Sequence, residues 1–139
     1  NSRNNRLIMP TIFSRIISGE IPCHKIAENE TYFAFLDIMP LAPGHVLVVP
    51  KMPVDYIFDV DDDILAGMLP FAKRIAHAME KVIPCERIGV SVIGLEVPHA
   101  HIHLIPLRTM DDINFSRPKL KMSNSELAEI AAKIVSHLQ

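Results

Sequence analysis

The chain has 139 residues, of which 49% are hydrophobic and 22% charged, and its formal net charge is −2. This length and composition predict a globular protein with a sizeable hydrophobic core and exclude a disordered chain. The sequence has no basic stripe of the kind that binds nucleic acid, and no hydrophobic run reaches the length of a membrane span.

The amino-terminal stretch NSRNNRLIMP is polar, lacks an initiator methionine and has no apolar segment long enough for a secretory leader. We expect residues 1–10 to be disordered or left over from expression, and residues 11–139 to form a single domain. The cysteines, Cys23 and Cys85, form no Cys-x-x-Cys pair and fit buried thiols better than a disulfide. A cytoplasmic location is therefore expected.

The first half of the chain predicts a short helix followed by three strands. Thr11 is a plausible helix cap, apolar residues follow it at helical spacing, and Gly19 ends the helix. Residues 23–30 and 31–38 predict two strands joined by a tight polar connection. HVLVVPK, residues 45–51, predicts a third strand that is covered on both faces.

The second half predicts a helix from about Asp61, two strands over residues 86–94 and 99–107, and a last helix that begins at the capping box of residues 123–126. Because the strands arrive in adjacent pairs, we expect an α+β fold in which helices pack on an antiparallel sheet. Residues 108–122 are long and weakly patterned, so this segment is expected to be mobile or docked on something such as a second subunit.

Three of the seven histidines stand in the stretch VPHAHIHLIP, residues 97–106. Because side chains alternate across a strand, His99, His101 and His103 are expected on one face and the apolar residues between them on the other. Imidazole can act near neutral pH as a nucleophile, a hydrogen-bond donor or a metal ligand. Three imidazoles in this spacing therefore argue for a site and against a chance solvated surface.

Two kinds of chemistry fit such a row. Alternate histidines can chelate zinc, with a third ligand elsewhere and a water in an open position. Alternatively, a central histidine can be a nucleophile while its neighbours orient it and bind the charge that develops. The metal hydrolase is the weaker interpretation, because the chain has no His-Glu-x-x-His and no carboxylate at ligand spacing.

The order His99-Ala-His101-Ile-His103-Leu-Ile resembles the signature of the histidine triad (HIT) family of nucleotide hydrolases and transferases. Residues 12–51 are similar to the amino-terminal half of its Hint branch, whereas residues 108–139 match only in outline. The resemblance implies a five-stranded antiparallel sheet with a short amino-terminal helix, a long central helix and a carboxy-terminal helix. It also implies a homodimer, and we expect no cofactor.

By this resemblance, His101 attacks the α-phosphorus of a purine nucleotide conjugate, such as an AMP phosphoramidate or a dinucleotide. A nucleotidyl-histidine forms, which water then hydrolyses. His103 would donate to the phosphoryl oxygens or the leaving group, His99 would brace the site, and His45 matches a fourth histidine of the family. Protonated neighbours would stabilise charge on the phosphoryl oxygens.

The resemblance also assigns nucleotide-binding residues. Asp37 matches the acidic residue that accepts hydrogen bonds from the ribose hydroxyls, although an Asp before Pro40 fits a turn cap equally well. Candidates for the base pocket, each of which fits plain core as well, are Phe13, Ile16, Ile38 and Leu47.

The chain departs from the family just before the triad, where Asn and then Gly-Gln-Ser or Gly-Gln-Thr usually supply donors for phosphate. Here the residues are Gly94-Leu95-Glu96, and a carboxylate beside a phosphate is unfavourable unless it is protonated or turned away. Glu96 therefore points away, handles a proton or marks a different substrate. Ser91 and the amides around Gly94 are the remaining donors. A nucleotide-binding regulatory module with little turnover stays open as a third function.

Some bacterial members of the family hold zinc through a Cys-x-x-Cys, a His after the Pro-Lys and a triad histidine. Here the first three positions are Thr11, Ser14 and Pro53. Hydroxyls are poor zinc ligands and proline is none, so we expect no metal of this kind.

Overall fold

The computed structural model describes residues 10–139, so the expectation about the amino-terminal stretch falls, apart from Pro10, outside the described residues. The helices are α2 (Ile12–Ile17), α3 (Asp62–Val82) and α4 (Asn124–Ser136), with short 3-10 helices η1 (Ile57–Asp59) and η2 (Met110–Ile113). The strands are β1 (Lys25–Glu28), β2 (Tyr32–Leu36), β3 (Val46–Pro50), β4 (Arg87–Ser91) and β5 (Ile102–Leu107). No helix within this range has the length and apolar character that crossing a membrane requires.

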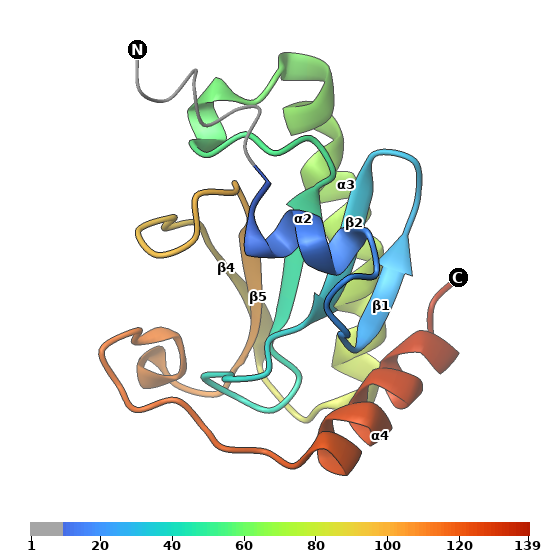
Figure 1. Cartoon of the computed structure of the whole chain (residues 1–139). Helices are drawn as coiled ribbons and strands as arrows, with labels where there is room; N and C mark the ends of the chain where they lie inside the picture. Colours follow the sequence, from blue (N-terminus) through green and yellow to red (C-terminus); the bar gives the residue numbers. More distant parts are fainter. Residues whose placement is uncertain (1–9) are drawn as a thin grey trace.

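The five strands form one antiparallel sheet in the order β1-β2-β3-β5-β4 (Figure 1). Neighbouring strands β1, β2 and β3 follow one another in the chain, whereas α3 separates β3 from β4 and places β4 at the sheet edge. The α+β fold with an antiparallel sheet of five strands is therefore confirmed. In the register, His103 of β5 lies opposite Leu47 of β3 on one side and Ser91 of β4 on the other.

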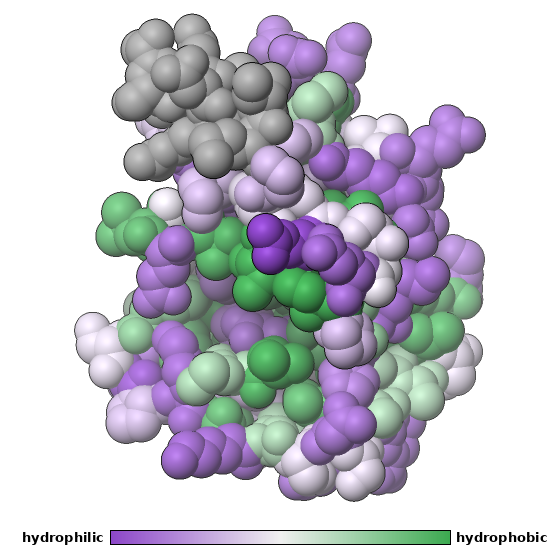
Figure 2. Space-filling model, viewed as in Figure 1, coloured by the Kyte–Doolittle hydropathy of each residue, from purple (hydrophilic) through white to green (hydrophobic). Residues whose placement is uncertain are grey.

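The two faces of the sheet are covered differently. Helices α3 and α4 pack on one face and enclose the largest hydrophobic cluster, which includes Ala34, Val48, Ile75, Leu104 and Ile134. On the other face, Phe13 of α2 packs against Phe33, Phe35, Leu47 and Val49. Figure 2 views this second face and shows a hollow between α2 and the segment after β2, with hydrophobic side chains on both rims.

Capping boxes begin both α2 and α4; the sequence predicts Thr11 as the cap of the first helix and the full box of residues 123–126 for the last. The Ser14 N–H donates to Oγ1 of Thr11 at 3.0 Å, and the Thr11 N–H donates to Oγ of Ser14 at 3.2 Å. Ser123 and Glu126 make the same reciprocal pair at 3.1 and 3.0 Å. Each cap satisfies donors that a helix leaves free and stabilises it by about 1 kcal/mol.

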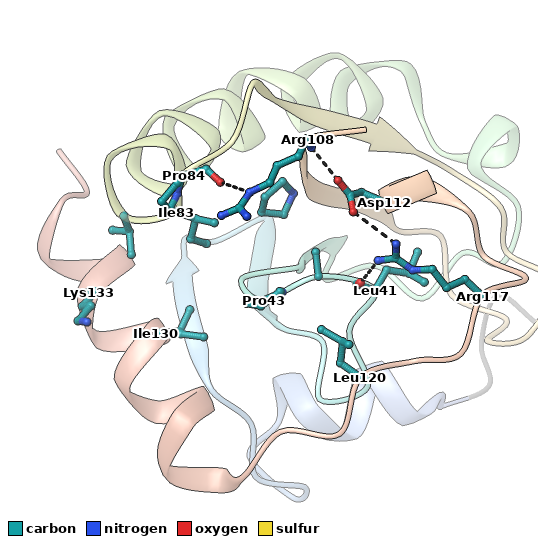
Figure 3. A pocket seen from close by; sticks show the side chains of 13 residues that line it. Leu41, Pro43, Ile83, Pro84, Arg108, Asp112, Arg117, Leu120, Ile130 and Lys133 are labelled. Carbon is teal, nitrogen blue, oxygen red and sulfur yellow. Dashed lines mark hydrogen bonds and ion pairs between the residues drawn. The ribbon is translucent and has the colours of Figure 1, made fainter. Parts of the chain in front are cut away.

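The segment over residues 108–122 docks on the chain itself. Its Arg117 guanidinium donates to the Leu41 carbonyl at 2.5 Å and also pairs with Asp112 (Figure 3). The Leu120 N–H donates to the Pro40 carbonyl at 2.8 Å. Of the two expectations for this segment, docking is therefore correct, and the surface that receives it is the turn after β2. We call residues 114–120 the strap.

Candidate active site

The three triad histidines and His45 form one buried cluster. Each of the four residues is at most 8% exposed. The ring centroids of His101 and His103 lie 4.9 Å apart, and those of His45 and His103 lie 5.2 Å apart. The fold therefore brings His45, which is 58 residues from His103 in the chain, to the predicted row.

The row does not lie within one regular strand. Strand β5 begins one residue before His103, so the other two triad histidines precede it. The preceding segment is held by a loop, because the Ala100 N–H donates to the Val54 carbonyl at 2.6 Å. The strand predicted over residues 99–107 is thus wrong for residues 99–101. Within them, the Ala100 N–H bonds to a loop carbonyl and not to a neighbouring strand.

A series of hydrogen bonds fixes the protons of His45 and His103. The Leu41 N–H donates to Nδ1 of His45 at 3.1 Å, so the proton of the neutral ring is on Nε2. This Nε2–H donates to Nδ1 of His103 at 2.9 Å. His103 consequently carries its own proton on Nε2, where it is a hydrogen-bond donor.

His101 has the opposite arrangement. Its Nδ1 lies 2.6 Å from the His99 carbonyl and must carry the proton, which leaves a lone pair on Nε2. Every buried side-chain nitrogen or oxygen of residues 10–139 has a hydrogen-bond partner. Nε2 of His101 has none among these residues, so within this range its lone pair is not held by a donor. A nucleophilic lone pair on His101 and an N–H on His103 stand on adjacent rings.

His99 is held at both ring nitrogens. Its Nε2–H donates to the Pro50 carbonyl at 2.7 Å, and its Nδ1 accepts the Thr11 hydroxyl at 2.7 Å. Thr11 is also the cap of α2, so this helix and the segment that carries His101 are joined through one threonine. The bracing role expected of His99 remains a prediction, and these bonds describe how it would act.

Burial lowers the pKa of all four imidazoles from the ordinary value of 6.5. The pKa of His45 falls to about 3 and that of His103 to about 4, because the charges of nearby His and Lys residues add to the effect of burial. The rings are thus neutral at pH 7. These directions favour neutral N–H groups as the donors of the site over the protonated neighbours that the resemblance implies.

Asp37 caps the turn after β2, because its Oδ1 accepts the Met39 N–H at 2.9 Å. Its Oδ2 lies 3.8 Å from Nε2 of His45, so the carboxylate also borders the histidine cluster. Burial raises the pKa of Asp37, against the Met39 N–H and the charge of Lys119, which lower it. The turn-cap interpretation is confirmed, and the ribose-binding role remains a prediction.

The segment before the triad carries three further predicted residues. Ser91 is the cross-strand neighbour of His103 and is half-buried. Gly94 has a φ of 75°, and its N–H makes no hydrogen bond within residues 10–139. Glu96 is exposed and accepts no hydrogen bond in that part of the chain, yet its charge raises the pKa of His101. This effect of Glu96 opposes the larger lowering of the His101 pKa by burial.

The residues predicted for the base pocket divide into two kinds. Phe13 packs its ring edge-on to His101, with centroids 5.0 Å apart, and Ile16 and Leu47 belong to the same cluster. Phe13 and Leu47 are core residues that also border the site, since Leu47 is the cross-strand neighbour of His103, whereas Ile16 packs on their cluster. Ile38 is 62% exposed and is not core. Lining of a base by these residues remains a prediction.

Sequence reasoning misses two residues of the strap, of which Phe115 contacts His103 and Lys119 contacts Phe115. The Phe115 ring lies 4.8 Å from the His103 ring, and the ammonium of Lys119 lies 5.0 Å from the centre of the Phe115 ring. The segment that carries them has no periodic pattern, and no local signal relates them to His103. Only the docking of the strap brings them to the site.

Asp37, His45 and His103 place possible metal-ligand atoms within 4.8 Å of one another. A metal on Nε2 of His45 would displace the proton to Nδ1, where it would face the Leu41 N–H, and two buried donors would then oppose each other. This donor set does not fit a metal. At the other candidate position, the Thr11 and Ser14 hydroxyls bond to each other at 3.2 Å.

Comparisons with known proteins agree on one family. A model described as HIT domain matches residues 18–110. Adenosine 5'-monophosphoramidase HNT1 of Saccharomyces cerevisiae is 41% identical over 98 residues, which cover 70% of this chain and 62% of the yeast protein. The Schizosaccharomyces pombe adenosine 5'-monophosphoramidase is 31% identical over 134 residues, covering 94% of this chain and 100% of that protein.

Solved structures show the same likeness. The crystal structure of a Hit-like protein involved in cell-cycle regulation from Bartonella henselae matches with a TM-score of 0.79 and 31% identity, over 92% of this chain and 96% of that one. The family match includes all four clustered histidines and ends before the strap. The chain belongs to the histidine triad (HIT) family.

Proposed function

We propose that this protein hydrolyses purine nucleotide conjugates at the α-phosphate through a nucleotidyl-His101 intermediate. The observation that carries the proposal is the proton arrangement of two adjacent rings, a lone pair on Nε2 of His101 and an N–H on Nε2 of His103. The names of the two yeast relatives, adenosine 5'-monophosphoramidases, support an AMP amidate as the substrate.

In the first step, Nε2 of His101 attacks phosphorus and the bond from phosphorus to the leaving group breaks. The charge that His101 acquires is stabilised by its Nδ1–H bond to the His99 carbonyl. The Nε2–H of His103 donates to the phosphoryl oxygens or to the leaving group. In the second step, water attacks phosphorus, the bond from phosphorus to Nε2 of His101 breaks, and AMP leaves with His101 in its neutral form. The proton that water gives up to solvent balances the one that the leaving amine takes up in the first step.

The other nucleotide contacts belong to the same proposal. Asp37 binds the ribose, Phe13, Ile16 and Ile38 line the base, and Ser91 with the Gly94 amide donates to phosphate. Their support is position: Phe13 borders His101, Asp37 borders His45, and Ser91 borders His103.

The test is to quench the reaction with an AMP amidate within milliseconds and to map the modified peptide by mass spectrometry. We expect one adenylyl group on the peptide that contains His101, stable to base and labile to acid. Release of AMP without any modified peptide would contradict the covalent route. Tight AMP binding with no turnover across a panel of conjugates would instead identify the regulatory module.

We further propose a homodimer that pairs along β4. This strand is at the sheet edge, and beside it Leu69 and Val90 expose 57% and 51% of their surface. These side chains line a hollow between α3 and β4. An apolar edge strand is a surface that a second copy can complete by antiparallel pairing.

Substituting Val90→Lys is therefore expected to convert a dimer into a monomer, which light scattering after gel filtration would measure. The matched control is Val135→Lys on α4, because Val135 is 43% exposed and lies away from the edge strand. A monomeric unsubstituted protein, or an unchanged dimer in the Val90 variant, would contradict pairing along β4.

A further inference from the structure

We propose that Lys119 binds the phosphate group of the nucleotide, so that a residue outside the family match completes the site. This inference rests on the proposed function, because it needs a nucleotide at the histidines. The family match ends at residue 110, nine positions before Lys119.

The position of Lys119 depends on Phe115. The Phe115 ring packs at 71° to the His103 ring with centroids 4.8 Å apart, and it also borders His45 at 6.4 Å. The Lys119 ammonium lies over the face of that ring and donates to the Phe115 carbonyl at 3.4 Å. One aromatic ring therefore separates the ammonium from the predicted donor of the reaction.

The strap is anchored on both sides of Lys119. Arg117 donates to the Leu41 carbonyl and pairs with Asp112, whose carboxylate also accepts the Arg108 N–H at 2.7 Å (Figure 3). On the other side, Leu120 is tied to the turn after β2 by the bond of its N–H to the Pro40 carbonyl. Since Leu41 also donates to His45, the strap and the histidines share one support.

Charge gives this position a function. The four imidazoles are neutral at pH 7, whereas two carboxylates lie near them: Oδ2 of Asp37 is 3.8 Å from Nε2 of His45, and the charge of Glu96 acts to raise the pKa of Asp37 and of His101. A phosphate entering this site would add one or two negative charges. The charge of Lys119 acts on Asp37, His45 and His103, lowering the pKa of each. Leu95 and Glu96 stand where the family usually has a glutamine and a hydroxyl residue, so donors for phosphate are lost and a negative charge is added. The positive charge of Lys119 offsets the resulting repulsion of the phosphate.

A purely structural lysine would make the same contacts with Phe115 through its aliphatic stem. Lys119→Met keeps an unbranched stem over the ring and removes the charge, and Lys119→Arg keeps the charge. Lys121→Met is the matched control, because Lys121 is an exposed lysine two residues further along the chain.

The experiment measures the affinities for AMP and adenosine by calorimetry in the unsubstituted protein and the three variants. We expect Lys119→Met to weaken AMP binding about tenfold and to leave adenosine binding unchanged, because only AMP carries the phosphate charge. Lys119→Arg and Lys121→Met should stay within about threefold of the unsubstituted protein. The salt dependence of AMP binding should be smaller in Lys119→Met.

Equal losses for AMP and adenosine would show that Lys119 only supports the fold and would overturn the inference, as would unchanged AMP affinity. Either result is compatible with a trapped nucleotidyl-His101, so the proposed function would stand without Lys119. If the unsubstituted protein bound no AMP, both proposals would fall together.

Discussion

Replacing His101 with alanine is expected to lower kcat/KM for an AMP amidate by about 10³-fold or more, because the attacking lone pair is lost. Neighbouring imidazoles cannot take over. Both ring nitrogens of His99 are occupied by the Pro50 carbonyl and the Thr11 hydroxyl. In His103, Nδ1 accepts from His45 and Nε2 carries the proton.

The hydrogen bonds of the cluster predict a smaller loss of activity when His103 is replaced than when His101 is. An asparagine there keeps an N–H donor but breaks the bond to His45, so we expect His103→Asn to lose about 10–10²-fold in kcat. AMP affinity should change less than turnover in both variants, which separates loss of chemistry from loss of the pocket. His77→Ala, at an exposed position of α3, is the matched control and should retain full activity.

The expected order is therefore His101→Ala far below His103→Asn, with the control at full activity. If His101→Ala turned over the amidate as fast as the unsubstituted protein, the covalent mechanism would be wrong. If His101→Ala and His103→Asn lost activity equally together with AMP affinity, the loss would reflect a collapsed site, and near-ultraviolet circular dichroism would reveal it.

Local patterns account for the parts of the structure that sequence reasoning predicts. Thr11 and Ser123 are capping residues whose hydrogen bonds span three positions, so their signal lies within one turn of helix. Short continuous apolar runs bounded by turn residues placed β2 and β3, whose residues are all buried. The His row and its resemblance to the HIT signature located the site.

Long-range contacts account for what sequence reasoning misses. Thr11 meets His99 across 88 positions, and the strap brings Phe115 and Lys119 to the cluster without any periodic pattern. Which nitrogen of each imidazole holds the proton depends on carbonyl and N–H groups such as those of Pro50 and Leu41. Such partners are backbone groups, which leave no trace in residue type.

The charge of the histidines is another property that the spacing alone cannot reveal. Solvated imidazoles near a phosphate would be partly protonated near neutral pH, which is what the row predicts if its environment is ignored. Burial beside like charges reverses this for His45 and His103. Acid should therefore destabilise the folded protein.

Lowering the pH from 7 to 5 is expected to reduce the free energy of unfolding by about 2 kcal/mol for each of His45 and His103. In the unfolded chain both rings bind a proton near pH 6.5, whereas in the folded protein their pKa values are about 3 and about 4. Between these values the unfolded state binds more protons, so stability falls with pH. The loss begins near pH 6.5 and is complete at the folded pKa values.

Urea unfolding at half-unit steps of pH measures this slope. His77→Gln removes a histidine from an exposed position of α3 and is the matched control for the substitution itself. His45→Gln should lower stability at pH 7, because it disturbs the bonds to Leu41 and His103, but should lose about 2 kcal/mol less than the unsubstituted protein between pH 7 and pH 5.

A second measurement keeps the prediction testable if His45→Gln does not fold. Nuclear magnetic resonance of the imidazole ring protons should show no titration of His45 or His103 in the folded protein above pH 5. Titration of either ring near pH 6.5 would contradict neutral donors. It would also restore an imidazolium as the group that meets the phosphate, and Lys119 would no longer be needed to balance Asp37 and Glu96.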